Sequence, residues 1–326
     1  MNMWTAKNFL EFCIDTNGLN IKPWARQLET GIKVLGEWCP SCSTDPYWFH
    51  KGVQVDTTIT QIKRNVQLLE HGKCPKCMRS RQDLIHEGWI KDYEEVVNAP
   101  GQRSGGTTLA SMLAAYLTHH ILLLNNPQDT FNLPTPPSDS GCNLLGTFVE
   151  STYKMAQSGS WENFHNLISN SPWFESFHQQ LKNLRIKFKF KKTFISYPHQ
   201  GLMLGSSNTR PQNIRGTTRI FAFTTNLRTT NKVKETIYGL DNSLRTVRWK
   251  GKDLPFSVGL LFHTTWTDSE TTWYKNCTYK DLLGIDPQGD PYISNLPTVE
   301  CNPLAPPETI PVDQHAIRDY GPKKSW

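Results

Sequence analysis

The sequence predicts an α/β fold, in which a mostly parallel sheet is flanked by helices and preceded by a small cysteine-rich insertion. Apolar strand-like runs alternate with helical patterns along the chain, as in βαβ units. The 326 residues, 37% of them hydrophobic and 11% aromatic, can bury a large core without disulfide bonds. Four of the eight cysteines form two close pairs, which in a chain without a signal peptide indicates metal binding.

Charge and hydropathy exclude several classes of protein. The net charge of +6, from 35 Lys+Arg against 29 Asp+Glu, is compatible with nucleic-acid binding but does not establish it. The aromatic content excludes a disordered chain. No segment approaches the roughly 18 apolar residues of a membrane span, and the N-terminus lacks the basic and apolar regions of a signal peptide. We therefore expect a chain that stays in a reducing compartment without membrane contact.

The first hundred residues are expected to be mainly helical. Apolar residues at helical spacing predict a helix over 25–35, within an N-terminal helical segment at 1–37. A helix that begins near Asp56 and ends at Gly72 is expected between the cysteine pairs. A third amphipathic helix is expected over 79–97.

The rest of the chain predicts the elements of the sheet. A glycine-rich segment precedes an unbroken helix at 109–124, and a Pro/Asp/Ser-rich surface loop follows it. Trp161 and Trp173 are expected to anchor the core, and the pair His119–His120 is expected to be a packing feature rather than a ligand pair. The other expected elements are a helix over about 155–168 that ends near Pro172, and strands at 144–149, 185–191, 193–197 and 219–224.

The paired cysteines form two CPxC turns, which comprise Cys39, Cys42, Cys74 and Cys77. Each turn can direct two thiolates at one ion, and two turns complete a tetrahedral four-cysteine shell for Zn²⁺. Because four thiolates leave no open position, we expect a structural metal site. Redox chemistry through one CxxC pair and a nucleic-acid-binding knuckle are the alternatives.

The segment APGQRSGGTT at 99–108 precedes the long helix and has the composition of a phosphate loop. Small residues let backbone N–H groups surround an anion, and the helix N-terminus attracts negative charge. The usual lysine before the Thr/Ser position is absent, because Gly106 precedes Thr107. A glycine-containing helix start without a ligand is the alternative interpretation.

Several segments, taken in order, resemble the N-terminal ATPase domain of the large terminase subunit of tailed bacteriophages. PWARQ at 23–27 resembles the adenine-recognition segment, and the CPxC module resembles an inserted zinc ribbon. GQRSGGT at 101–107 resembles the phosphate loop of the family. Further similar segments lie at 148–174, 206–208, 214–218, 298–303 and 318–321.

This resemblance implies a P-loop NTPase of the ASCE type that packages double-stranded DNA into procapsids as a homo-oligomeric ring. It implies Zn²⁺, ATP and Mg²⁺ as cofactors, with the portal protein and the small terminase subunit as partners. It places the protein in the host cytoplasm, transiently at the procapsid portal. The implied domains are 1–37, a zinc-ribbon-like insertion at 38–78, an ATPase-like core at 79–317 and the start of a nuclease linker at 318–326. The implied nucleotide-binding residues are Trp24, Gln27, Gly101, Gln102, Arg103, Ser104, Gly105, Gly106, Thr107 and Thr108.

Departures from the family pattern predict impaired or absent hydrolysis. Gly106 stands at the lysine position, and Thr225 and Asn226 stand where a Walker B strand has Asp and Glu. The coupling segment reads Thr264–Thr265–Trp266, with no proline. No nuclease is expected, because the chain ends at Trp326. The alternatives are an inactive structural or DNA-binding assembly protein, or half of a split terminase completed by a separate nuclease chain.

Charged residues outside these motifs provide further candidates. RIKFKFK at 185–191 alternates with period two, which places cations on one strand face. This face is either a solvated sheet edge or a contact for DNA phosphates through Lys187, Lys189, Lys191 and Lys192. Three acids near the motifs could compensate for the missing carboxylates, but they are expected to be solvated at the surface: Glu150, Glu235 and Asp241.

Overall fold

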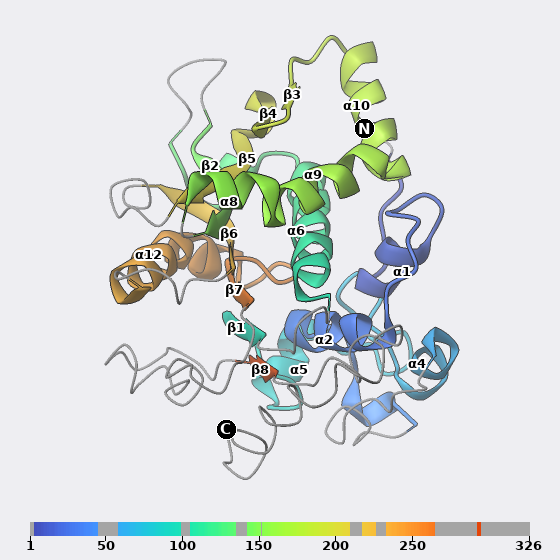
Figure 1. Ribbon diagram of the computed structural model, residues 1–326. Helices are drawn as coiled ribbons and strands as arrows, with labels where there is room; N and C mark the ends of the chain where they lie inside the picture. Colours follow the sequence, from blue (N-terminus) through green and yellow to red (C-terminus); the bar gives the residue numbers. More distant parts are fainter. Residues whose placement is uncertain are drawn as a thin grey trace, which may run out of the picture.

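The computed structural model describes residues 3–44, 58–98, 105–134, 142–150, 152–208, 217–225, 233–264 and 292–294 (Figure 1). Within them, eight strands form one sheet in the order β3-β4-β5-β2-β6-β7-β1-β8. The strands from β5 to β8 in this order run parallel, and β4 and β3 extend the β5 edge in antiparallel fashion. The α/β class with a mostly parallel sheet is therefore confirmed. The strands are β1 Glu95–Asn98, β2 Leu144–Glu150, β3 Lys189–Lys191, β4 Phe194–Tyr197, β5 Leu202–Asn208, β6 Thr218–Thr225, β7 Leu260–Thr264 and β8 Tyr292–Ser294.

Helices cover both faces of the sheet, and the central strands are accordingly apolar along most of their length. Figure 1 shows α6 (Gly106–Leu123) and α12 (Val233–Gly251) on opposite sides of the sheet. The short α8 (Tyr153–Ser158) and α9 (Ser160–Asn170) follow β2, and α9 packs against α6. No helix of the described residues is long and apolar enough to cross a bilayer.

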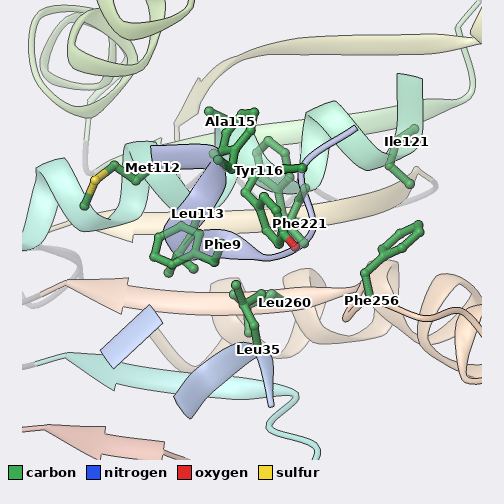
Figure 2. Close-up of a cluster of buried hydrophobic side chains, with 14 of the residues drawn as sticks. Phe9, Leu35, Met112, Leu113, Ala115, Tyr116, Ile121, Phe221, Phe256 and Leu260 are labelled. Carbon is green, nitrogen blue, oxygen red and sulfur yellow. The ribbon is translucent and has the colours of Figure 1, made fainter. Parts of the chain in front are cut away.

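The helix α6 lies at the centre of the main hydrophobic core (Figure 2). It is apolar on nearly all sides, as expected of a helix enclosed by other elements. One side meets the sheet through Phe221 and Leu260, and the other meets α1 (Phe9–Ile14) and α2 (Ala25–Leu35). His119 belongs to this core, where its ring contacts Trp173, so the packing interpretation of this histidine is confirmed.

The cysteine-rich module, which is the insertion at 38–78 together with the helix that follows it, packs onto the same core. It contains the 3-10 turn η1 (Pro40–Cys42) and the helices α4 (Ile59–Asn65) and α5 (Arg81–His86). The backbone N–H of Leu69 donates to the Glu37 carbonyl at 3.1 Å, and the side chain of Gln82 donates to the Leu254 carbonyl near β7. The module is thus bonded both to the segment after α2 and to the sheet region.

Two helix predictions in this module are wrong in extent. The helix expected up to Gly72 ends at Asn65, because the next residues pair with the segment after α2, as in the Trp38–Leu68 bridge. The helix expected over 79–97 is limited to α5, and its last residues form β1 instead. Val96 and Val97 are β-branched and occupy the strand, which burial between β7 and β8 stabilises.

Beyond β2, the expected helix is interrupted and a second one was missed. Gly159 separates α8 from α9, and Pro172 begins a further helix, α10 (Pro172–Asn183), instead of only ending one. Proline suits the first helical position, where its missing N–H has no partner to lose. The strand expected from residue 185 begins only at Lys189, because Arg185 has a left-handed backbone (φ +56°). The elements not predicted also include β5, α12, α7 (Pro127–Thr130) and η2 (Pro198–Gln200).

Candidate functional site

The carboxyl ends of four neighbouring strands place polar residues in one row. Asn98 of β1 pairs with Thr264 of β7, and Thr264 pairs with Thr225 of β6. Glu150 ends β2 one position beyond the Val149–Thr224 pair, so it continues the row beside Thr225. Ligands of open parallel sheets bind outside the carboxyl ends of the strands. This strand-end row is therefore the candidate site.

Two threonines of the strand-end row are held close to the core. Thr225 is buried, and its hydroxyl donates to the Ser160 hydroxyl of α9 at 3.5 Å. The hydroxyl oxygen of Thr264 is buried and has no hydrogen-bond partner among the described residues. A buried hydroxyl of this kind is expected to meet a water or a ligand. Asn226, Thr265 and Trp266, which belong to the same predicted motifs, lie outside the described residues.

Glu150 does not behave as predicted from the sequence. Glu150 is only 4% exposed, so the expectation of a solvated surface carboxylate is wrong. The cause is α9, which begins over the end of β2 and donates to Glu150 Oε1 from the N–H (3.3 Å) and the hydroxyl (3.0 Å) of Ser160. A Cβ atom at Gly159 would lie 2.8 Å from the same oxygen, so this approach requires glycine.

The other two acids differ in their surroundings. Asp241 of α12 forms an ion pair with Arg248, so it too is not a free surface carboxylate. Glu235, in the first turn of α12, is exposed as expected. Neither residue belongs to the strand-end row.

The predicted phosphate loop is described only at its end. Residues 99–104, which include Gly101, Gln102, Arg103 and Ser104, lie outside the described residues. Gly105 is the N-cap of α6 and has φ +77°, a conformation that favours glycine. Gly106, Thr107 and Thr108 form the first turn of this 18-residue helix, whose N-terminus attracts anions.

The predicted adenine-recognition residues contact this loop end directly. The side-chain amide of Gln27 donates to the Gly105 carbonyl at 3.1 Å, and its Oε1 accepts from the Trp24 N–H at 2.9 Å. A Cβ atom at Gly105 would lie 2.4 Å from Gln27 Nε2 and 2.7 Å from the Trp24 ring. The fold thus brings together two motifs that are 78 positions apart in the sequence.

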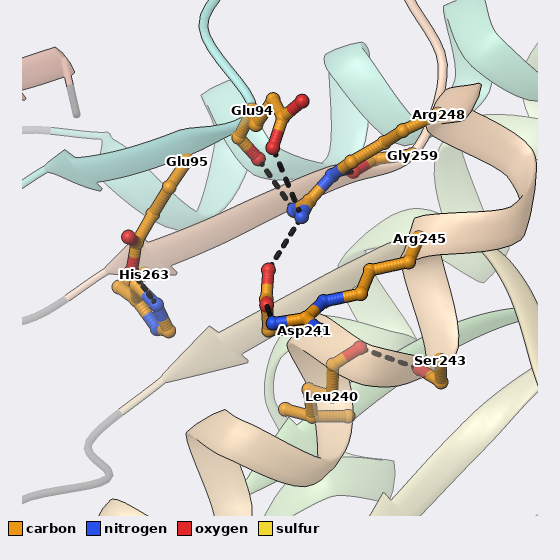
Figure 3. Close-up of polar contacts among 9 residues, drawn as sticks. All are labelled: Glu94, Glu95, Leu240, Asp241, Ser243, Arg245, Arg248, Gly259 and His263. Atoms are coloured by element: carbon orange, nitrogen blue, oxygen red, sulfur yellow. Dashed lines mark hydrogen bonds and ion pairs between the residues drawn. The ribbon is translucent and has the colours of Figure 1, made fainter. Parts of the chain in front are cut away.

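A polar network missed by sequence reasoning begins one residue before the strand-end row, and Figure 3 shows its Glu95 and His263 side chains. His263 of β7 bonds Glu95 of β1 through Nε2 and Thr224 of β6 through Nδ1, both at 2.7 Å. All three residues are buried. Because a carboxylate accepts, Nε2–H of His263 donates to Glu95, and the Thr224 hydroxyl bonds Nδ1 on the other side of the ring. The network fixes these three strands relative to one another just below the row.

Figure 3 also shows how α12 is attached at the amino ends of β1 and β7, away from the strand-end row. The Arg248 guanidinium donates to the carbonyls of Gly259 (2.7 Å) and Glu94 (2.9 Å) and pairs with the carboxylates of Glu94 and Asp241. Burial raises the pKa of Glu94, and Arg248 opposes that shift. This arginine has its partners within the fold and serves packing.

The four paired cysteines meet at one point. Their sulfur atoms all lie within 4.8 Å of one another, and Cys39 Sγ is 3.7 Å from Cys77 Sγ. Tetrahedral zinc with Zn–S bonds of about 2.3 Å requires sulfur atoms about 3.8 Å apart, so the donor set fits this metal. The backbone N–H of Arg79 lowers the pKa of Cys77 to about 6, whereas burial raises the pKa of Cys39 to about 12. A bound cation would stabilise all four thiolates.

The basic strand lies at the β3 edge of the sheet that the described residues form. Lys189 and Lys191 of β3 are exposed, as are Lys187 and Lys192 beside it. Between them, Phe188 and Phe190 turn inward to His178: the Phe188 ring stacks on it with centroids 4.7 Å apart, and the Phe190 ring meets it edge-on at 5.2 Å. The alternation predicted for this segment is confirmed, and it leaves a row of lysines facing outward.

Comparison with known proteins gives partial similarities. No protein-family model matches the chain. A stretch of 166 residues is 28% identical to the amylovoran biosynthesis protein AmsF of Erwinia amylovora, and it covers 51% of this chain. The chain spans only 18% of the length of that relative.

Two solved structures are similar in part. The large terminase ATPase domain of Thermus phage P74-26 is 13% identical, with 74% of this chain and 91% of that chain covered and a TM-score of 0.35. A mutant of the same domain is 12% identical, with 65% and 79% covered and a TM-score of 0.33. The fold and the candidate site described above therefore rest on the strand order and contacts of this chain itself.

Proposed function

We propose that the chain is a nucleotide-binding domain of the ASCE P-loop type that resembles the ATPase motor domain of phage large terminases and serves DNA packaging. The contact of Gln27 and Trp24 with Gly105 carries this proposal. This contact holds Gln27 and Trp24 against the N-cap of α6, where the phosphates would bind. An adenine and a phosphate chain can then be bound by adjacent parts of one site.

The strand order supports the same proposal. In an ASCE core, an additional strand separates the strand before the phosphate loop from the Walker B strand. Here β7 lies between β1, which leads into the loop, and β6, which ends in Thr225. The order β8-β1-β7-β6-β2 is the arrangement expected for such a core.

The residues present would bind nucleotide weakly. Gly106 supplies no cation for the β- and γ-phosphates, so binding relies on backbone N–H groups and the α6 N-terminus. Thr107 is the residue whose hydroxyl would bind Mg²⁺, which when bound neutralises phosphate charge. Thr225 and Asn226 are neutral and cannot take a proton from water.

Titration of the purified chain with a fluorescent ATP analogue and Mg²⁺ tests this proposal. We expect binding in the millimolar range or tighter, and we expect Gln27→Ala to weaken it at least about tenfold, equivalent to about 1.4 kcal/mol. Gln61→Ala is the matched control, because Gln61 is also the third residue of its helix and accepts from its N-cap N–H. Absence of binding at millimolar nucleotide would refute the proposal.

The alignment of the catalytic positions can be tested separately. We expect the combined substitutions Gly106→Lys, Thr225→Asp and Asn226→Glu to increase phosphate release, because they restore the cation and both carboxylates. Unchanged release from a folded triple variant would show that these positions are not the catalytic ones.

We further propose that the chain contacts double-stranded DNA through the lysines beside and within β3. Their outward row can approach phosphates without burying the strand, and its charge is not cancelled by an acid between residues 182 and 192. Salt dependence is measured as the slope of log K for DNA binding against log[salt]. Replacing Lys189 and Lys191 with Ala should reduce the magnitude of this slope by about 0.9 for each phosphate that is no longer neutralised. Replacing Lys154 and Lys252, which are exposed elsewhere, should leave it unchanged.

The partners proposed for such a domain are the portal protein, the small terminase subunit, further copies in a ring, and a separate nuclease chain. The zinc-ribbon-like module at 38–78 would hold a structural Zn²⁺. The neutral Thr225 favours a second candidate, in which the same fold is an inactive DNA-binding assembly partner or half of a split terminase. Nucleotide binding without phosphate release, together with DNA binding, would support that candidate.

A further inference from the structure

We infer that Glu150 is the carboxylate that activates the attacking water in this site, in place of the glutamate missing from β6. The inference rests on the proposed nucleotide-binding function. Hydrolysis of a nucleoside triphosphate needs a group that orients a water and accepts its proton. The strand-end row contains Asn98, Thr264, Thr225 and Glu150, and Glu150 is the one carboxylate among these four side chains.

Glu150 lies on the correct side of the sheet. The register pairs Phe148 with Phe223, so Glu150 and Thr225, two positions further on each strand, share that face. Phe148 contacts Phe164 of α9, with ring centroids 5.0 Å apart, and α9 packs against α6. The Glu150 carboxylate is therefore on the face occupied by α6, at the edge where the N-terminus of α6 begins.

The Glu150 carboxylate is held in position through one of its two oxygen atoms. Both hydrogen bonds that the described residues supply to it come from Ser160 and go to Oε1. The Thr225 hydroxyl reaches the same Ser160 hydroxyl, which links Glu150 to the Walker B position through a single side chain. Oε2 is then available for a water placed beside Thr225.

Capping of α9 by Glu150 is the structural alternative, and it makes a different prediction. Ser160 needs only an acceptor oxygen, which a glutamine amide also provides. The substitution Glu150→Gln should therefore preserve the cap and remove the base. A role in capping alone predicts unchanged chemistry in this variant.

The chemical step is a simple hydrolysis. The water oxygen bonds to the terminal phosphorus while the bond from that phosphorus to the bridging oxygen breaks, which releases a nucleoside diphosphate and inorganic phosphate. The proton of the water passes to the Glu150 carboxylate and then to solvent. No oxidant or reductant is needed.

The experiment measures nucleotide affinity and phosphate release in the same preparations, with ATP and Mg²⁺. Glu150→Gln should reduce phosphate release about 100- to 10,000-fold, the usual contribution of a general base, and leave the dissociation constant of the nucleotide within about threefold. Glu162→Gln, at an exposed residue of α9, removes an equal charge and should change neither quantity.

Each outcome separates this inference from the proposed function. Unchanged phosphate release in folded Glu150→Gln overturns the role of Glu150, as does a wild-type chain that binds nucleotide but releases no phosphate. A wild-type chain that binds no nucleotide instead overturns the proposed function. If Glu150→Gln does not fold by circular dichroism, Glu150→Asp is used, which retains a carboxylate but withdraws it by one methylene. Loss of at least about tenfold in release is then expected, and an unchanged rate overturns the inference.

Discussion

Substitution of Gly105 by alanine tests the contact on which the proposed site depends. Gly105 has φ +77°, and a Cβ atom there would lie 2.4 Å from Gln27 Nε2 and 2.7 Å from the Trp24 ring. Gly88 provides a matched control, because its φ is +75° and an added Cβ would meet no atom within 4 Å. Alanine at either position incurs the same backbone strain, but only Gly105→Ala must displace Gln27 and Trp24.

The magnitudes follow from these two environments. A left-handed backbone costs an alanine about 1–2 kcal/mol, and we expect Gly88→Ala to lose about that much free energy of unfolding. Gly105→Ala also loses the 3.1 Å hydrogen bond from Gln27, which contributes about 0.5–1.5 kcal/mol. Displacement of the Trp24 ring adds to this loss. The difference between the two variants should therefore be about 1–2 kcal/mol.

Urea denaturation followed by intrinsic fluorescence measures this difference through the transition midpoint, with the slope m shared between the variants. The double variant Gln27→Ala/Gly105→Ala completes a thermodynamic cycle, and its two substitutions should be less than additive because they remove the same contact. Equal destabilisation by Gly105→Ala and Gly88→Ala, within about 0.5 kcal/mol, would refute the described contact.

Three further predictions concern the metal, the core and the response to acid. Elemental analysis should find one zinc per chain, and Cys74→Ser should lose it together with thermal stability; a content far from one would exclude the four-cysteine site. Phe148→Ala should lower the free energy of unfolding by about 3–5 kcal/mol, measured in guanidinium chloride, because the ring is fully buried against Phe164 and Phe223. Burial lowers the pKa of His120 to about 3, so below pH 6.5 the unfolded chain binds a proton that the folded chain excludes, and stability should fall by about 1.4 kcal/mol per pH unit. His120→Gln should make this decline shallower; an equal slope in both proteins would contradict the assignment. Burial raises the pKa of Glu37 to about 7. Between pH 4.5 and 7 the folded chain therefore binds a proton that the unfolded chain does not, and this stabilises the folded chain as the pH falls. Glu37→Gln removes that opposing contribution and should make the decline in stability steeper.

Predictions from the sequence were most accurate where a local pattern and a boundary signal agree. The helix α2 has the predicted bounds 25–35, since its apolar face is regular and Gly36 ends it with φ +63°. The long helix α6 and the strands β2, β4 and β6 also lie where they were expected, within a few residues. The cluster of four cysteines was found from their spacing, because each CPxC pair is formed by a local turn.

Features that depend on contacts between distant elements were missed. From the sequence, Glu150 is indistinguishable from an ordinary surface acid at a strand end. Its burial results from α9, which begins over the end of β2. The network of Glu95, His263 and Thr224 combines residues separated by 168 and 39 positions, so no local pattern marks it. The four-residue β1 is too short for periodicity and is stabilised by its neighbours β7 and β8.

The helix α2 gives the cysteine-rich module and the proposed nucleotide site a common support. Its 11 residues span about 16 Å, with Gln27 in the first turn against Gly105 and Cys39 four residues beyond the last turn. Arg81 of the module donates to the carbonyl of Leu35 at 2.8 Å, which joins the two directly. The helix thus connects the cysteine-rich module to the proposed base-recognition residues. Metal content and nucleotide affinity should therefore rise and fall together in this chain, although their ligands share no atom.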